Sequence, residues 1–143
     1  MDEQRGFSLI ELLIVVTVIG ILAAVAVPNL LKSRAAANEA SAIASVRTIV
    51  TAQITYSATV GDGSYAVDLA ELEGAGLIDA ALAAGTKDGY TFVSAGAGDM
   101  FAVNADPSQI GVTGERGFYS DQTAVIRYAV GAVADVTSPP LGS

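Results

Sequence analysis

The sequence predicts an α+β protein in which a long N-terminal α-helix packs on a small antiparallel β-sheet. Three features indicate this class. An uncharged apolar run fills residues 12–31, helical spacing of apolar residues continues to about residue 54, and β-type runs joined by glycine-rich links fill the second half. A single helix over residues 7–59 would be about 80 Å long. Such an element suits the backbone of a polymer better than the scaffold of an enzyme.

The composition removes several kinds of chemistry. The 143 residues, about one domain, contain no His, Cys or Trp. Ser-His-Asp and Cys-His catalysis need an imidazole base, zinc sites almost always use His or Cys, and a disulfide needs two cysteines. The formal net charge of −8 and the pI near 4.2 disfavour nucleic acid as a partner, because phosphates call for clustered Lys and Arg. We therefore expect neither an enzyme nor a nucleic-acid-binding protein.

The apolar run is long enough to cross a membrane. From Leu12 to Leu31 there are 20 consecutive residues without a charge, about 30 Å of helix. A cleaved secretory signal is the alternative, and Ala24-Val25-Ala26 resembles the cleavage site of such a signal. The acidic residues Asp2 and Glu3 count against a signal, as does a run longer than the usual apolar stretch of about 7 to 15 residues.

Glu11 lies just inside the start of this apolar segment. An acidic residue costs roughly 2.5–3.5 kcal/mol at the centre of a membrane helix and less near the interface. A residue that is costly in its own environment usually has a partner or a task. The alternative is that Glu11 is an ordinary first-turn acid, favoured there by the helix dipole.

The string Arg5-Gly6-Phe7-Ser8-Leu9-Ile10-Glu11-Leu12 resembles the N-terminus of type IV pilins and type II secretion pseudopilins. By this resemblance residues 1–6 are a leader, and a prepilin peptidase cuts between Gly6 and Phe7 and methylates the new amine of Phe7. Cleavage on the cytoplasmic side leaves the apolar segment in place. The resemblance also implies a homopolymeric filament, built at the inner membrane by an assembly platform and its ATPase.

General chemistry supports a role for the motif. Cleavage would leave an α-amino group on Phe7 with a reference pKa of about 8, largely cationic at neutral pH. When two such helices pack with a stagger, the amine of one subunit can meet Glu11 of another, so neither charge lies unpaired in an apolar place. The pair would then set the register of an incoming subunit more than it adds stability.

Gly20 and Pro28 interrupt the membrane half of the helix, residues 7–31. Pro28 lacks an amide hydrogen and crowds the carbonyl four residues back, which predicts a kink or local opening over residues 25–28. Gly20 weakens the helix by up to about 1 kcal/mol. The family resemblance implies that the segment between these two residues extends during assembly.

The amphipathic half of the helix, residues 32–60, is predicted to end before Gly61-Asp62-Gly63. Its apolar positions follow a +3, +4, +4 spacing: Ile43, Val46, Val50 and Ile54.

Residues 61–130 are predicted to form a globular head with a four-stranded antiparallel sheet. Asp68 with Glu71 forms the capping box of a short helix closed by Gly74, and Asp79 caps a second one closed by Gly85. The strands are expected at residues 90–94, 100–105, 117–120 and 124–130.

Alternation along the first two strands places Tyr90 with Phe92 on one face, and likewise Phe101 with Val103. The simplest use of these faces is to pack on the second half of the long helix. The tail, residues 131–143, is predicted to be either a flexible end or a loose cover over an edge of the head.

The search for ligand sites yields one candidate set. Asp99, Asp106 and Asp121 are candidate calcium ligands, but EF-hand spacing is absent and surface turns are the alternative explanation. The major pseudopilins that the chain resembles use calcium in the region of the sheet. No other metal or cofactor is expected.

We therefore expect a major pilin-like structural subunit of a type IV pilus, and the alternative is the major pseudopilin of a type II secretion system. Many type IV pilins close their C-terminal region with a disulfide, and the absence of Cys departs from that pattern. The precursor would lie in the bacterial inner membrane and the product in an extracellular or periplasm-spanning filament. A secreted binding domain and a membrane-anchored enzyme are the rival classes.

Overall fold

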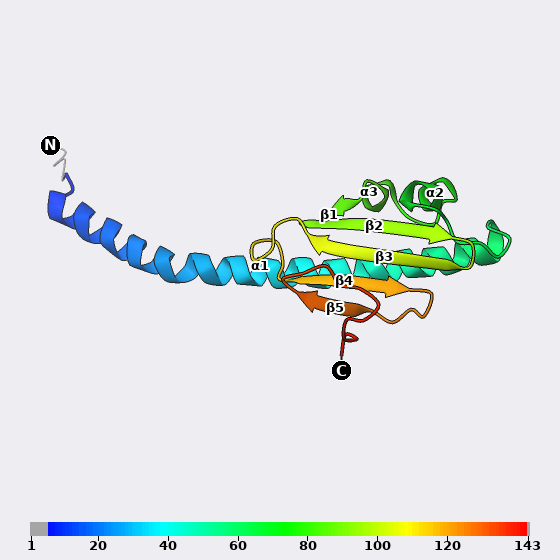
Figure 1. The fold of residues 1–143 in the computed structure, drawn as a ribbon. Helices are drawn as coiled ribbons and strands as arrows, with labels where there is room; N and C mark the ends of the chain where they lie inside the picture. The colour runs from blue at the N-terminus through cyan, green and yellow to red at the C-terminus, as the bar shows by residue number, and fades with distance from the viewer. Residues whose placement is uncertain (1–5, 143) are drawn as a thin grey trace. The chain divides into compact units, whose positions relative to one another are not determined.

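A computed structural model gives the fold and describes residues 6–142 (Figure 1). The chain divides into two compact units, Met1–Ser33 and Arg34–Ser143, which are described in turn. The helices are α1 (Leu9–Thr59), α2 (Leu69–Gly74) and α3 (Ala80–Ala83), and the strands are β1 (Thr86–Lys87), β2 (Tyr90–Ala97), β3 (Met100–Pro107), β4 (Arg116–Asp121) and β5 (Arg127–Val130). The predicted α+β class is confirmed.

The first unit contains the apolar half of α1. The helix begins at Leu9 and not at the predicted Phe7, because Ser8 and Glu11 form a capping box. The Ser8 amide donates to Glu11 Oε2 at 2.9 Å, and the Glu11 amide donates to Ser8 Oγ at 3.4 Å. The most apolar 18-residue window of α1 has a mean hydropathy of 2.8, and none of it is buried. By length and composition this helix can cross a membrane.

Helical structure continues through Gly20 and Pro28 without a break. The local opening predicted over residues 25–28 is therefore absent. One residue after the proline, Asn29 Nδ2 donates to the Val25 carbonyl at 3.2 Å. The kink itself stays a prediction.

In the second unit, one stripe of α1 is buried against the sheet and the loops of the head. The spacing prediction is right for Val46 and Val50, but Ile54 is 45% exposed. The buried stripe instead continues through polar and aromatic residues, which a search for aliphatic residues passes over. Its members are Glu39, Ala42, Ser45, Val46, Ile49, Val50, Ala52, Gln53 and Tyr56.

The sheet has five strands in the order β1-β2-β3-β4-β5, each antiparallel to its neighbour, and not the four strands predicted. The additional strand, β1, pairs with the start of β2 through the two-residue turn Asp88-Gly89. Both turn residues have positive φ, 49° and 75°. An Asp-Gly pair is the residue choice that such tight hairpins favour, so the sequence carried a signal for this strand.

The predicted faces of β2 and β3 are confirmed. Tyr90, Phe92, Phe101 and Val103 are all buried in the core. Figure 1 shows the second half of α1 along one face of the sheet. The last strand, β5, begins at Arg127 and not at Ala124, because Ala124 has a φ of 58° and closes the turn after β4.

Both short helices begin where they were predicted. The Glu71 amide donates to Asp68 Oδ1 at 2.9 Å, and the Leu82 amide donates to Asp79 Oδ1 at 2.8 Å. Gly85 ends α3 with a φ of 76°, as expected, whereas the left-handed residue after α2 is Gly76 and not Gly74.

The described part of the tail, residues 131–142, is hydrogen-bonded to the head, which is the arrangement of an edge cover. The Leu141 amide donates to the Ile126 carbonyl at 2.7 Å, and the Tyr128 amide donates to the Pro139 carbonyl at 3.0 Å. These bonds occupy the free edge of β5, which would otherwise expose unpaired backbone groups. Ala134 of the tail is buried, and its carbonyl accepts a hydrogen bond from Asn104.

Candidate assembly sites

The N-terminal motif forms a small apolar hollow at the start of α1. Phe7, Glu11, Leu12 and Val15 line a volume of about 340 Å³. Within residues 6–142, the hydrogen-bond partner of the Glu11 carboxylate is the Ser8 amide. The first-turn role that was the alternative for Glu11 is thus present in this structure, and Glu11 Oε1 has no hydrogen-bond partner among residues 6–142. Gly6 and Phe7 precede the helix and have no regular secondary structure.

The structure does not bring the three candidate calcium ligands together. In the strand register Asp106 lies opposite Thr91 and Asp121 lies opposite Ala102, while Asp99 lies in the turn between β2 and β3. Among the described residues, no three acidic side chains form a group that would hold a metal ion.

The environments of these aspartates favour the turn explanation. Asp121 Oδ1 accepts hydrogen bonds from the Thr123 amide at 2.9 Å and the Thr123 hydroxyl at 2.6 Å, so it stabilises the turn after β4. Burial raises the pKa of the Asp106 carboxyl. Its Oδ1 is buried and has no hydrogen-bond partner among the described residues.

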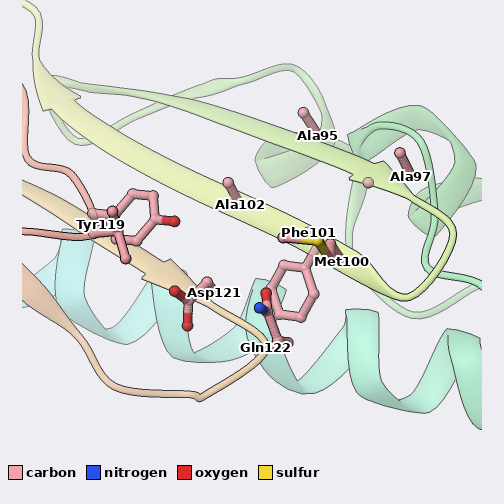
Figure 2. Close-up of a pocket in the computed structure, with 10 residues that line it drawn as sticks. Ala95, Ala97, Met100, Phe101, Ala102, Tyr119, Asp121 and Gln122 are labelled. Atoms are coloured by element: carbon pink, nitrogen blue, oxygen red, sulfur yellow. The ribbon is translucent and has the colours of Figure 1, made fainter.

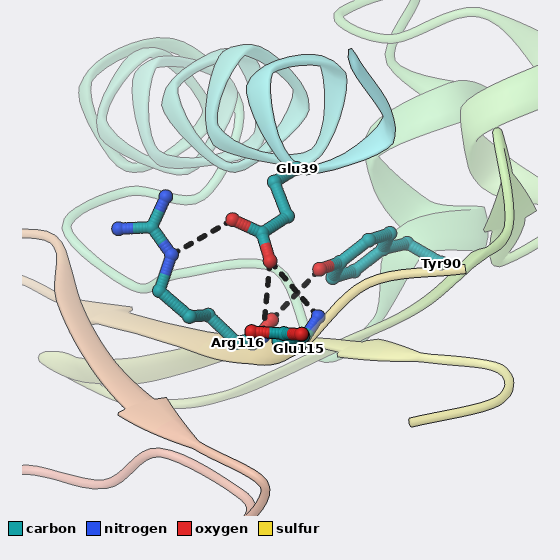
Figure 3. Close-up of polar contacts among 4 residues, drawn as sticks. All are labelled: Glu39, Tyr90, Glu115 and Arg116. Carbon is teal, nitrogen blue, oxygen red and sulfur yellow. Dashed lines mark hydrogen bonds and ion pairs between the residues drawn. The ribbon is translucent and has the colours of Figure 1, made fainter. Parts of the chain in front are cut away.

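Glu39 of α1 connects the helix to the start of β4 (Figure 3). Its Oε1 accepts from the amides of Glu115 and Arg116 at 2.9 and 3.2 Å, and its Oε2 accepts from Arg116 Nε at 2.8 Å. The Tyr90 hydroxyl donates to the Arg116 carbonyl at 2.8 Å beside this group. One carboxylate therefore joins the helix to the loop between β3 and β4.

The charge of Glu39 is stabilised where it lies. Burial raises the pKa of the Glu39 carboxyl, but the hydrogen bonds from the Glu115 amide and from Arg116 outweigh burial, and the pKa lies below its ordinary value. Burial also raises the pKa of Tyr90 well above its ordinary range, with the Glu39 carboxylate adding to the effect. Tyr90 therefore stays a neutral hydrogen-bond donor.

Gln53 forms a second polar connection, deeper in the head. Its Nε2 donates to the Ala66 carbonyl at 3.0 Å and to Ser94 Oγ at 2.9 Å, and its Oε1 accepts from the Ala66 amide at 2.8 Å. This fully buried side chain joins α1 to the loop before α2 and to β2.

Sequence reasoning missed both connecting residues, although a signal existed. Glu39 and Gln53 lie in phase with the buried aliphatic residues of α1, so each is a polar residue on the apolar stripe. A polar residue in such a place must have partners inside the fold.

A groove of about 400 Å³ lies on the face of the sheet that points away from α1 (Figure 2). Its floor is formed by small residues of the two central strands, Ala95, Gly96, Ala97 and Ala102. Its sides are formed by Met100, Tyr119 and Val136, the last from the tail. The hollow exists because alanine and glycine occupy neighbouring positions where larger side chains would fill the surface.

The arrangement suits assembly. The polar groups described above hold elements together: Glu39 is paired with amides and Arg116, Glu71 with an amide and the Tyr56 hydroxyl, and Asp121 with Thr123. The apolar residues of α1 in the first unit, by contrast, have nothing covering them. They need either lipid or other helices around them.

Comparison with known proteins gives a consistent set of relatives. The family model described as the prokaryotic N-terminal methylation motif matches residues 1–27. The type IV wide pilus major component PilA4 of Thermus thermophilus is 32% identical over 131 residues, which cover 87% of this chain and 93% of that protein.

Two further relatives match over a shorter part of the chain. The type IV major pilin protein PilA of Myxococcus xanthus is 49% identical over 51 residues, 36% of this chain and 23% of that protein. The type II secretion system core protein G of Escherichia coli is 40% identical over 45 residues, 32% of this chain and 31% of that protein. No solved structure shows a significant match.

Proposed function

This chain belongs to the type IV pilin family, and from that premise we propose that it is the major structural subunit of a type IV pilus, assembled through its N-terminal helix. One observation carries the proposal. The similarity to the wide pilus component extends over 93% of that protein and so includes the head as well as the helix. The long apolar helix segment without cover supports the same role, since filament packing would supply the missing contacts.

Maturation is the first step of the proposed function. A prepilin peptidase removes residues 1–6 by cutting between Gly6 and Phe7 and then methylates the amine of Phe7. The match of residues 1–27 to the methylation motif supports this step. Gly6 and Phe7 lie before the first turn of α1, which suits a peptidase because cleavage there needs no unwinding of the helix.

Assembly then uses the pair formed by the new amine and Glu11. The Phe7 amine of an incoming subunit meets the Glu11 carboxylate of a subunit already in the filament. The geometry supports the pairing, because Ser8 occupies one oxygen of Glu11 and the other is free to accept a cation. Two charges in an apolar core are costly unless they meet, so the contact selects one axial register.

The precursor is inserted once in the inner membrane with its N-terminus in the cytoplasm, and the subunit passes from there into the filament. An inner-membrane assembly platform and its ATPase are the partners for this transfer. Gly20 and Pro28 weaken the helix between them and make this segment the place where α1 extends on assembly.

The mass of the N-terminal peptide tests the proposal. It is measured in two fractions of cells that make the protein, sheared extracellular material and membranes. A methylated Phe7 start in the sheared fraction supports a surface pilus. A start at Val27 would show that an ordinary signal peptidase removes the apolar segment, and the filament function would then be wrong.

The alternative is the major pseudopilin of a type II secretion system. The 40% identity to core protein G over 45 residues and the absence of Cys favour it. In that case the methylated Phe7 start is found in membranes and is missing from sheared material.

A further inference from the structure

We propose that the groove on the outer face of the sheet receives the opposite end of the head of a second copy, and that this contact repeats from subunit to subunit. The inference rests on the proposed function as a filament subunit and names the contact between heads. The groove is the hollow lined by Ala95, Ala97, Met100, Ala102, Tyr119 and Val136.

The groove is shaped to accept an apolar group. Three alanines form its floor, Ala95 and Ala97 exposed and Ala102 half-buried, and the Met100 side chain, 60% exposed, stands at its edge (Figure 2). Ala95 and Ala102 lie opposite each other on neighbouring strands. The polar side chains of the lining, Tyr119, Asp121 and Gln122, come from β4 and the turn after it. Water over the alanine floor has few polar partners, so an aliphatic side chain replaces it with a gain in free energy.

The opposite end of the head exposes aliphatic side chains that project from its loops. We call these residues the apolar end: Ile110, Val112, Val130 and Val133, each more than half exposed. The loop between β3 and β4 carries the first two, and the Gly131 amide donates to the Glu115 carbonyl, which keeps the end of β5 beside this loop. The two segments that carry the apolar end are therefore held side by side by a backbone hydrogen bond.

The groove and the apolar end cannot meet within one molecule. Ala102 lies at the centre of the groove, and β3 runs five residues further to Pro107 before the loop begins, about 17 Å at 3.4 Å per residue. Figure 1 shows this loop and the β2–β3 turn at opposite ends of the strands. A surface that fits a different surface of the same protein gives a heterologous contact, and such a contact propagates into an open filament when its rotation does not close into a ring.

Charge favours the pairing of the groove with the apolar end over the pairing of two grooves. The Tyr65 amide donates to the Gly98 carbonyl, so the loop before α2 lies beside the β2–β3 turn. The groove half of the head thus carries six acidic residues against one arginine: Asp62, Asp68, Glu71, Glu73, Asp99 and Asp121, with Arg127. Two such ends would repel each other.

The apolar end lies among nearly balanced charges. Arg34, Lys87 and Arg116 accompany four acids at this end of the head, Glu39, Asp88, Asp106 and Glu115. An acidic groove meets less repulsion at such a surface than at a second groove, so the second copy presents its apolar end.

Cross-linking tests the contact directly, because the chain contains no cysteine. The double variant Ile110→Cys with Met100→Cys is expressed in cells, and filaments are treated with a short bis-maleimide and run on a denaturing gel. Both side chains are exposed, so neither change disturbs the core. The expected result is a ladder of bands at multiples of the subunit mass. Either single variant lacks one of the two sites and should give no ladder.

Matched variants separate this contact from filament formation itself. Ala102→Trp fills the groove floor and should weaken the ladder by at least about tenfold, the factor for losing one buried aliphatic contact. Ala81→Trp, on the exposed surface of α3, should leave the ladder unchanged. Filaments of the double Cys variant without a ladder, or dimers from Met100→Cys alone, would overturn the inference while leaving the proposed function intact. Failure of the wild-type chain to form any filament would overturn both.

Discussion

Replacing Glu39 by glutamine should destabilise the head by about 1–2 kcal/mol at pH 7. The substitution keeps the size of the side chain and an acceptor oxygen for the amides of Glu115 and Arg116. It also places an amide NH2 against Arg116 Nε, which donates to Glu39 Oε2 at 2.8 Å in the native protein. Two donors then face each other, and a charge-assisted bond is lost.

The magnitude follows from the exposure of the two partners. The Glu39 side chain is 11% exposed and that of Arg116 is 35% exposed, so water can solvate the freed guanidinium and the loss stays below that of a fully buried pair. Glu39→Ala removes both acceptor oxygens and leaves two amides without partners. Its expected cost is about 3 kcal/mol.

The effect of Glu39→Gln should depend on pH in a defined direction. Because the folded-state pKa of Glu39 is lowered, its contribution is fully present above the unfolded value of about 4.5 and is lost as the pH falls through the folded pKa. The difference in unfolding free energy between wild type and Glu39→Gln should therefore be largest near neutral pH. It should shrink as the pH falls below about 4.5.

Urea unfolding of the full chain in detergent measures this difference. All five tyrosines lie in the second unit, so near-ultraviolet circular dichroism reports on the head and not on the apolar part of α1. Glu73→Gln, at an exposed position on α2, is the control and should change stability by less than about 0.5 kcal/mol. A Glu39→Gln difference that is absent at pH 7, or that stays constant down to pH 3, would refute this account of Glu39.

Three further substitutions have defined outcomes. Gln53→Leu leaves three buried groups without partners and should cost about 3 kcal/mol in the same urea assay, whereas Ile54→Gln on the exposed face should cost little; equal costs would contradict the role of Gln53. Gly117→Ala would place a methyl carbon 2.7 Å from the Ala132 carbonyl oxygen and should speed amide exchange in the tail, measured by mass spectrometry, and unchanged exchange would argue against this packing. Glu11→Ala should abolish sheared filaments while the precursor still enters the membrane, and normal filaments would remove its role in register.

Local signals in the sequence were enough for much of the fold. The uncharged run of 20 residues, the caps at Asp68 and Asp79, and the alternation along β2 and β3 each depend on residues close together in the chain. Such patterns decide helix, turn and strand because the backbone responds to its nearest neighbours. The same holds for the N-terminal motif, which lies within the first 27 residues.

Other features depended on residues far apart in the sequence. Glu39 and Arg116 are separated by 77 residues, and Gln53 and Ser94 by 41, so spacing alone could not pair them. The tail binds the edge of β5 because that strand has no other neighbour, a condition visible once the order of the sheet is known.

By itself, the sequence determined that this chain carries an N-terminal methylation motif, a membrane-length apolar helix, a separate head of alternating strands and no imidazole or thiol. Those properties follow from the composition and from patterns among residues that are close together in the chain. The tertiary structure alone decided how the head is joined to α1 and where its surface is hollow. Glu39 and Gln53 connect parts of the fold only because the tertiary structure brings distant backbone groups within hydrogen-bonding distance of their side chains. The groove exists only because the strand register places Ala95 beside Ala102.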